Sequence, residues 1–314
     1  MTPTPSPAAV RPLTVGICTR DRHESLLRCV RSLRHAEDLV DRIVIADDAS
    51  VQPVEPILRA ALGDEAPEGL MVLRAEQRIG LSAGRNRVAE AARTPYVLYL
   101  DDDAALLSRD AVAAGIAVVD ADPSVAAVAF AQADGEGRLY PPGAQPSPAT
   151  QPSLVRSFIG FAHLLRREPL MALGGFREML TLTGEERELS FRLLDAGYRI
   201  VYLPDAPVAH VTDPGGRDTR SWLHLTVRND AISGLLNEPL PVALGMLPVR
   251  LWRYFPMRRH WGGEDPGGFR RIVRAVAESL PRVRRERRAV RWSTLRAWRE
   301  LAQSPPYHGP GRAP

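Results

Sequence analysis

The feature that most constrains the fold is an alternation in the first half of the chain, where short apolar runs are separated by segments of helical periodicity. Largely apolar runs occupy 13–19, 42–48, 69–75 and 95–100. Between the first two runs, apolar side chains recur at helical spacing at Leu26, Leu27, Val30 and Leu33. Strands that are apolar on both faces and alternate with helices are typical of a mostly parallel sheet covered by helices on both sides. We therefore predict an α/β fold.

Acidic residues follow two of these predicted strands. Asp47 and Asp48 end the second strand, and Asp101, Asp102 and Asp103 end the fourth. Ligands of such sheets bind beyond the carboxyl ends of the strands. One aspartate could cap the helix that follows, but adjacent carboxylates repel each other, and a hard divalent cation such as Mg²⁺ or Mn²⁺ would offset that repulsion. The spacing alone leaves helix capping and metal binding both open.

The second half of the chain is organised differently. A strand is predicted at 125–132, and the segment 133–153 is rich in Pro, Gly and Ser, which predicts a loop and a candidate lid. Two short strands are predicted at 198–204 and 208–211, and Arg-dense helices follow from about residue 235. The predicted organisation is a disordered tail at 1–11, a catalytic domain at 12–235, an Arg-rich helical extension at 236–302 and a disordered tail at 303–314.

Composition adds limits on compartment and partners. All 41 basic residues are arginines, and the pI is near 9.4. This bias is a weak indicator of nucleic-acid binding, and no nucleic-acid partner is expected. Cys18 and Cys29 have no metal-like spacing and are predicted to be reduced, buried thiols. The start of the chain lacks the pattern of a signal peptide, and no apolar run reaches the roughly 18 residues of a spanning helix, so a cytoplasmic protein is expected.

Several motifs together resemble the family 2 glycosyltransferases, which have the A-type glycosyltransferase fold. The likeness covers roughly residues 13–230, and the motifs follow in the family's order. They read VGICTRDRHESLLRCVRSL, IVIADDAS, RIGLSAGRN, YLDDDA and LGGFREMLTLTGEERELSFRLLDAGYRIVYLPDAPVAHV. Each motif alone is a weak signal, whereas their order makes the resemblance strong. It implies an inverting transferase with a nucleotide-binding sheet.

The resemblance assigns residues to the nucleotide-sugar donor. Thr19 and Asp47 match positions that line the base and ribose, and Arg20 and Arg85 are further donor-binding candidates. Without the resemblance, Thr19 would be interpreted as a hydroxyl at a strand end and Asp47 as a residue that forms a turn. Both interpretations remain open for these two residues.

The metal site is assigned in the same way. Asp101 and Asp103 match the outer residues of the Asp-x-Asp motif, which meet the ribose and the metal bound to the diphosphate, and Asp102 fits the variable middle position next to the donor. His210 matches a histidine that completes the metal shell in many relatives. The implied cofactor is Mn²⁺ or Mg²⁺. A single histidine on a short strand also has a purely structural interpretation.

The catalytic base is implied to lie in the acidic pair Glu185 and Glu186, with Glu186 as the base and Glu185 as a partner of the acceptor. The pair could also be the acidic first turn of a helix. Three positions depart from the family's pattern. Arg78 replaces an Asn, Arg177 replaces an Asp, and Glu186 itself is one methylene longer than the usual Asp. This extra length leaves open which of the two glutamates is the base.

The implied reaction moves a sugar from a nucleotide-diphospho-sugar, with UDP or dTDP expected, to an acceptor hydroxyl. The acceptor would be a glycan, a lipid-linked molecule or a small molecule, in the synthesis of cell-surface glycans or glycoconjugates. A sugar-phosphate nucleotidyltransferase is disfavoured, because residues 18–25 contain no glycine to cradle a triphosphate. The alternative from another class is a binding module that takes no part in catalysis and uses the basic C-terminal tail.

The Arg-dense segment 250–299 also contains Trp252, Tyr254, Phe255, Trp292 and Trp298. A cationic face with aromatic residues is typical of helices that lie on membrane surfaces. The sequence therefore predicts peripheral contact with the inner membrane face, and simple packing of this tail against the catalytic domain is an equal alternative.

Overall fold

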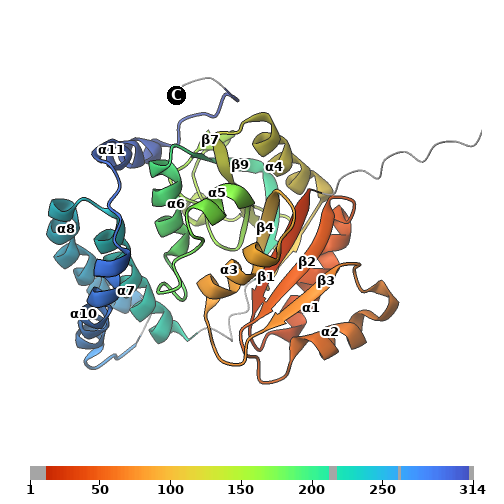
Figure 1. Cartoon of the computed structure of the whole chain (residues 1–314), viewed down its shortest axis with the longest axis horizontal. Coiled ribbons are helices and arrows are strands. Elements are labelled where there is room, and N and C mark those ends of the chain that lie inside the picture. Colours follow the sequence, from red (N-terminus) through yellow and green to blue (C-terminus); the bar gives the residue numbers. More distant parts are fainter. Residues whose placement is uncertain (1–11, 212–217, 261–262, 311–314) are drawn as a thin grey trace, which may run out of the picture.

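A central sheet organises the protein, which is described here by a computed structural model and shown in Figure 1. Within residues 12–211, 218–260 and 263–310, which the structure describes, the sheet has nine strands. Eight of them follow the order β3-β2-β1-β4-β8-β6-β9-β5, and β7 pairs with β9. The first strands of the chain are β1 Leu13–Thr19, β2 Val40–Asp47, β3 Leu70–Arg74 and β4 Tyr96–Asp101. They pair in parallel, as predicted from their apolar character.

The sheet becomes mixed beyond β4. Its remaining strands are β5 Ala104–Leu106, β6 Val125–Ala133, β7 Ser153–Leu154, β8 Ala162–Arg166 and β9 Arg199–His210. Strand β8 is antiparallel to both β4 and β6, whereas β9 is parallel to β6. The prediction of two separate short strands at 198–204 and 208–211 is wrong, because the single strand β9 runs through both ranges. A register shift against β6 accommodates the residues between them.

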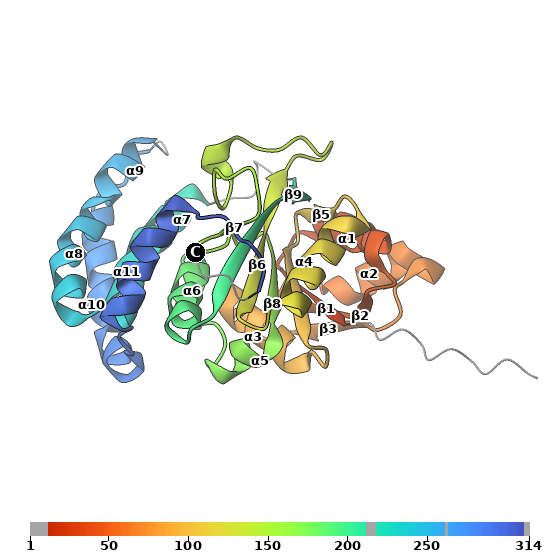
Figure 2. The ribbon, with the colours of Figure 1, turned by 90° about the horizontal axis from the view of Figure 1, so that it is seen from above.

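Helices cover both faces of the sheet, as Figure 2 shows from above. The helices of this part are α1 His23–Ser32, α2 Val54–Leu62, α3 Leu81–Ala91, α4 Arg109–Ala121, α5 Arg167–Ala172 and α6 Glu185–Asp195. Short 3₁₀ turns lie at Leu33–Ala36, Gly63–Glu65, Pro142–Ala144 and Leu301–Gln303. One apolar cluster contains Leu26, Leu58 and Val112, from α1, α2 and α4. A second contains Val88 and Leu189, from α3 and α6. The core therefore has two layers, one on each face.

The C-terminal helices form a group beside α6, at the left in Figure 2. They are α7 Thr219–Asn237, α8 Leu240–Trp252, α9 Tyr254–His260, α10 Gly268–Glu286 and α11 Trp292–Glu300. Helix α7 contacts α8 and α10, and α11 contacts α6. The predicted domain boundary after residue 235 falls inside α7, so the division into domains stays a prediction. Among the described residues, no helix combines the length and the apolar character needed to cross a membrane.

The end of the chain is held against the sheet. The backbone amide of Leu154 donates to the carbonyl of Pro305, and that of Tyr307 donates to the carbonyl of Pro152. The hydroxyl of Tyr307 also donates to Asp122, at 3.1 Å. The prediction of a disordered tail from residue 303 is therefore wrong for 303–310. The predicted tail at 1–11 and residues 311–314 lie outside the described residues.

Candidate active site

The triple aspartate forms the turn that joins two strands. Asp101 is the last residue of β4, Asp102 and Asp103 make the turn, and β5 begins at the next residue. Strand β5 is antiparallel to β9, with Ala104 opposite His210. This pairing brings His210 next to the turn, although the two lie far apart in the sequence. Its Nε2 is 3.3 Å from Oδ1 of Asp103.

Side-chain atoms of Asp101, Asp103 and His210 lie within 4.8 Å of one another. We call these three residues the acidic cluster. The orientation of the histidine ring follows from Gln132, whose Nε2 donates to the carbonyl of Ala144, so that its Oε1 faces Nδ1 of His210 at 2.7 Å. Nδ1 of a neutral ring then carries the proton. The lone pair of Nε2 is left facing a carboxylate oxygen, an arrangement that requires a proton or a metal ion between the two acceptors.

The residues of the acidic cluster fit a divalent cation. Two carboxylates and one imidazole are an oxygen-rich set of the kind that suits Mn²⁺ or Mg²⁺. Adjacent ligands in an octahedral site, each about 2.1 Å from the ion, are about 3.0 Å apart. The 3.3 Å between the His210 and Asp103 atoms is close to this spacing.

Arg22, which was not among the predicted site residues, neutralises the rest of the turn. Its guanidinium contacts Oδ1 of Asp102 and Oδ2 of Asp103, each at 2.8 Å. Thr19 donates to the other oxygen of Asp102 at 2.7 Å. Arg20, which was predicted to bind the donor, has its Nε 3.5 Å from the neighbouring Asp21, and its contact with a donor stays a prediction. Both arginines lie in the same loop, and spacing alone does not distinguish them.

The pKa values of the two buried aspartates of the turn are shifted in opposite directions. Burial would raise the pKa of Asp103, but hydrogen bonds from His210 and Arg22 outweigh it and lower the pKa to about 2. For Asp102, burial outweighs its contacts with Arg22 and Thr19, and the pKa rises to about 7. Asp103 is therefore the stronger anion of the two and the better ligand for a cation.

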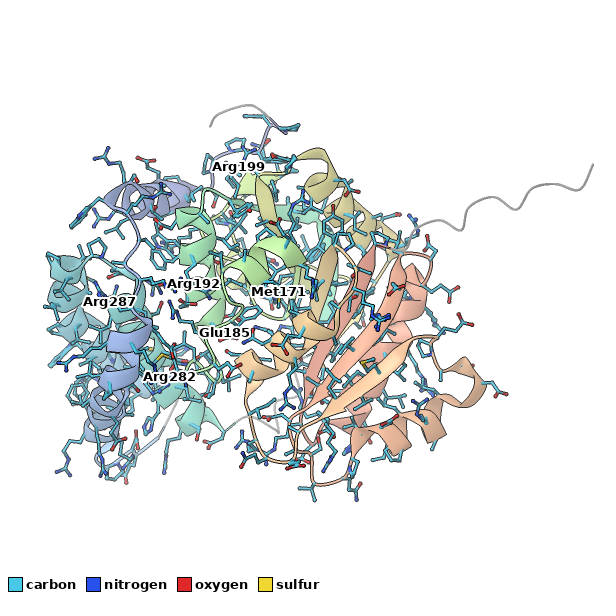
Figure 3. All side chains as sticks on the ribbon, viewed as in Figure 1. Met171, Glu185, Arg192, Arg199, Arg282 and Arg287 are labelled. Atoms are coloured by element: carbon cyan, nitrogen blue, oxygen red, sulfur yellow. The ribbon has the colours of Figure 1, made fainter. Side chains whose placement is uncertain are left out.

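Arg85 connects the acidic cluster to α6. It is only 2% exposed, and its Nη1 lies 3.0 Å from Oε1 of Glu185. Its Nη2 lies 3.3 Å from Oδ1 of Asp101 and donates to the carbonyl of Gly160 at 2.9 Å. Figure 3 labels Glu185 in the first turn of α6. The buried guanidinium of Arg85 thus links the acidic turn to Glu185 in one network. Direct contact of Arg85 with a donor stays a prediction.

The two glutamates of α6 differ in their surroundings. Glu185 is fully buried, and within the part of the chain that the structure describes its Oε2 has no hydrogen-bond partner. Burial and the neighbouring Glu186 raise the pKa of Glu185, and burial also raises the pKa of Glu186. A Cβ atom added to Gly160 would overlap Oε1 of Glu186, so this carboxylate lies directly over the glycine. A raised pKa is what a general base near neutral pH requires. Which glutamate is the base stays open.

Asp47 lies beside Thr19 in the sheet register and is 1% exposed. Its carboxylate accepts hydrogen bonds from the amide of Ser50 at 2.9 Å and from Arg74 at 2.7 Å. Burial opposes ionisation, but these hydrogen bonds outweigh it and lower the pKa of Asp47. The residue therefore builds the turn after β2. Its predicted contact with the nucleotide stays a prediction.

The two arginines that depart from the family's pattern have different environments. Arg78 is exposed. Arg177 pairs with the buried Glu188 at 2.6 Å and approaches Glu286 of α10 at 3.5 Å. Arg177 therefore links α6 to the C-terminal helices.

Comparison with known proteins agrees with this geometry. Residues 14–174, more than half of the 314, match the model of the glycosyl transferase family 2. The chain belongs to glycosyl transferase family 2. A relative is the pre-mycofactocin glycosyltransferase of Mycobacterium tuberculosis, which is 30% identical over 253 residues. That alignment covers 76% of this chain and 49% of the relative, so the chain spans about half the length of this curated relative.

Solved structures share the fold of this family 2 chain. A mannosyltransferase from Pyrobaculum calidifontis, in complex with GDP-Man and Mn²⁺, superposes with a TM-score of 0.60 at 18% identity, over 94% of this chain and 87% of that one. TarS 1-349 of S. aureus, in complex with UDP-GlcNAc, gives a TM-score of 0.60 at 15% identity, over 93% and 90%. The predicted α/β fold of the A-type glycosyltransferases, with C-terminal helices, is confirmed.

Proposed function

We propose that the protein is an inverting, metal-dependent glycosyltransferase, which moves a sugar from a nucleotide-diphospho-sugar to an acceptor hydroxyl. The observation that carries this proposal is the acidic cluster, linked through the buried Arg85 to the acidic pair of α6. One part of this arrangement is suited to the leaving diphosphate and the other to the attacking hydroxyl. The family supports the same reaction class, and so do the GDP-Man, Mn²⁺ and UDP-GlcNAc bound in the two solved structures compared above.

Each residue of the site is assigned a role in the proposed reaction that suits its chemistry. Asp101, Asp103 and His210 would hold the cation. When bound, it supplies Lewis-acid stabilisation of the charge that grows on the departing diphosphate. Glu186 accepts the proton of the acceptor hydroxyl as that oxygen attacks the anomeric carbon, and Glu185 orients the acceptor. Direct attack from the opposite face inverts the anomeric centre without a covalent intermediate.

The donor and acceptor are proposed by class. UDP- and dTDP-sugars are the proposed donors, with Thr19, Arg20, Asp47, Arg85 and Asp102 on the donor side. The acceptor is proposed to be a glycan or a lipid-linked molecule, in the synthesis of cell-surface glycans or glycoconjugates, and a small-molecule acceptor is the alternative. A cytoplasmic location, with peripheral contact at the inner membrane face, fits such an acceptor.

The metal assignment is tested by release of nucleoside diphosphate from a panel of nucleotide-sugars, with and without Mn²⁺. Asp103→Ala is expected to abolish Mn²⁺-dependent release and to weaken Mn²⁺ binding in calorimetry, because it removes a carboxylate ligand whose pKa is lowered to about 2. Asp64→Ala, at an exposed aspartate outside the acidic cluster, is the matched control. Full turnover by the Asp103 variant would exclude this metal site. A binding module would release no diphosphate under any condition.

The base assignment is tested by two isosteric substitutions. Glu186→Gln keeps the size of the side chain and removes the proton acceptor, so it should lower the transfer rate far more than donor binding. Glu185→Gln is the matched variant on the neighbouring residue. If Glu185→Gln is the variant that loses turnover, the two roles are exchanged.

A further inference from the structure

Helix α8 has an apolar surface on the outside of the C-terminal helices. One half of α8 packs on α7 and α10 through residues that include Ala243, Leu247 and Leu251. The other half faces solvent, with Leu244 53%, Val249 52% and Trp252 67% exposed. Pro241, Gly245, Met246 and Pro248 complete this exposed half. We call this half of the helix the α8 face. A helix that is apolar all round is normally covered all round.

The charged side chains within the segment that contains the α8 face have one sign. The segment 239–260, which contains α8 and α9, has four arginines and no acidic residue. Arg250 is buried against Glu238, and Arg253 pairs with Asp230. Arg258 and Arg259 are exposed on α9, directly after the apolar helix. The outer surface here therefore joins an uncharged apolar stripe to a cationic end.

Other residues of the Arg-dense segment 250–299 are part of the packing. Tyr254 is 1% exposed, and Trp298 is 7% exposed and stacks on Phe191 with ring centroids 3.7 Å apart. Arg287, labelled in Figure 3, donates to the carbonyls of Leu235 and Glu238 and so fixes α10 to the end of α7. Tyr254 and Trp298 are therefore packed inside the protein, which is the alternative interpretation given for the segment 250–299.

The geometry points to one occupant for the α8 face, which is the surface of a bilayer rich in anionic lipid. Apolar side chains of α8 enter the boundary between headgroups and acyl chains, and Arg258 and Arg259 meet the lipid phosphates. A second copy of the chain fits less well. A twofold contact through α8 would bring the same arginine-bearing α9 segments of both copies to one interface, with no acidic residue in 239–260 to pair with them.

This inference deepens the proposed function, because a transferase held at a membrane keeps its active site near an acceptor that is itself in the membrane. It rests on that function only for the identity of the acceptor. The docking surface lies on α8 and α9, whereas the acidic cluster lies on β4, β9 and the turn before β5. Membrane binding and donor turnover can thus be measured, and can fail, separately.

The test is co-sedimentation of the full chain with vesicles of phosphatidylglycerol and phosphatidylcholine, at low and high salt. The triple variant Leu244→Gln, Val249→Gln, Trp252→Gln is expected to bind about a hundredfold more weakly, since each half-exposed apolar side chain contributes about fivefold. The pair Arg258→Gln and Arg259→Gln should weaken binding about fivefold per arginine and flatten the salt dependence. Gln continues a helix well, so α8 is retained in each variant.

The matched control makes the same chemical changes at exposed apolar residues elsewhere, Val51→Gln, Leu139→Gln and Trp292→Gln. It should bind vesicles like the unaltered chain. Removal of residues after 265 would be a poor test, because it deletes buried core residues such as Ile272 and Val276. Donor hydrolysis in detergent-free buffer should be the same in the triple variant and the unaltered protein. If that hydrolysis is absent from both while vesicle binding persists, the proposed function fails and the docking surface stands.

Three results would overturn the proposal. The first is no binding to anionic vesicles at low salt, and the second is equal binding by the triple variant and the unaltered protein. The third is a concentration-dependent dimer of the unaltered protein in sedimentation equilibrium that the triple variant does not form. This result would make the α8 face a contact between copies. Loss of vesicle binding in the triple variant alone, with an unchanged circular dichroism spectrum and melting curve, supports the membrane surface.

Discussion

Replacing Arg85 with Met should destabilise the protein by an amount that depends on pH. Arg85 is 2% exposed and Glu185 is fully buried, with 3.0 Å between their charged atoms. Removing one partner of such a buried pair costs about 3–5 kcal/mol, because the other charge is left without compensation. The contact with Asp101, whose side chain is 33% exposed, adds at most about 1 kcal/mol. Methionine retains an unbranched side chain of similar length, so a cavity is a minor part of the loss.

The dependence on pH follows from Glu185. Its pKa is already raised by burial, and loss of the cation would raise it further. A group whose pKa is higher in the folded state stabilises the fold at low pH and loses that contribution as the pH rises. Because the pKa of Glu185 is about 8 in the unaltered protein, the loss in Arg85→Met should be small near pH 6, where Glu185 is protonated in both proteins, and should grow toward about pH 9.5, above that pKa.

The assay is urea unfolding, followed by tryptophan fluorescence and circular dichroism at both pH values. Arg87→Met, at an exposed position of the same helix, is the matched control and should change the free energy of unfolding by less than about 0.5 kcal/mol. Adding Glu185→Gln to Arg85→Met should recover part of the loss, because the uncompensated charge is gone. A loss that does not grow between about pH 6 and pH 9.5, or strictly additive effects in the double variant at the higher pH, would refute the reasoning.

Three further predictions follow from the same contacts. The pKa of Asp103 falls from the usual 3.8 to about 2 in the folded protein, so its contribution of about 2 kcal/mol should be present above pH 4 and lost toward pH 2. Urea unfolding across this range should show the loss, and Asp103→Asn should remove it. Gln132→Leu leaves Nδ1 of the cluster histidine without its acceptor, and calorimetry should show Mn²⁺ affinity reduced about 10- to 100-fold. Gly160→Ala should displace both the Glu186 carboxylate and the Arg85 guanidinium and reduce turnover by up to about 100-fold, whereas Gly143→Ala, in open space, should leave steady-state kinetics unaltered.

The parts of the site that follow from the sequence are those fixed by local pattern. The apolar run before Asp101 identifies a buried strand, and the carboxyl end of such a strand is where a ligand is expected. The position of the acidic turn at a ligand-binding edge therefore follows from the residues alone. The order of the strands in the sheet cannot be predicted in this way. Strands β8 and β6 lie between β4 and β9, and no residue pattern in the sequence indicates this position.

The missed residues depend on contacts between distant segments. Arg22 and Arg20 stand two residues apart, and only the backbone decides which one reaches the aspartates. Asp21 between them has φ 54°, a left-handed conformation that redirects the chain at this point. Gln132 contacts His210 only because β6 and β9 are neighbours. None of these relations has a local sequence signature.

The exposure of the α8 face could not be predicted from the sequence for a different reason. The sequence signal for membrane contact comes from arginines and aromatic residues, and α8 has few of either. Its mixture of leucine, valine, glycine and proline is equally typical of a buried helix, and only packing on one side leaves it exposed. Trp298 illustrates the converse, since an aromatic residue in an Arg-rich helix lies inside the protein.

The position of the acidic cluster in the sheet also has a kinetic consequence. Strand β5 has three residues and lies at the end of the strand order, so its pairing with β9 opens at a lower free energy than the central strands do. Opening of that short ladder separates Asp103 from His210 while β1, β2 and β4 remain paired. A cation held by Asp103 and His210, as proposed, would join the two sides of this ladder, and it would slow the exchange with solvent of the backbone amides of β5 and of Val211, which donates to the carbonyl of Asp103.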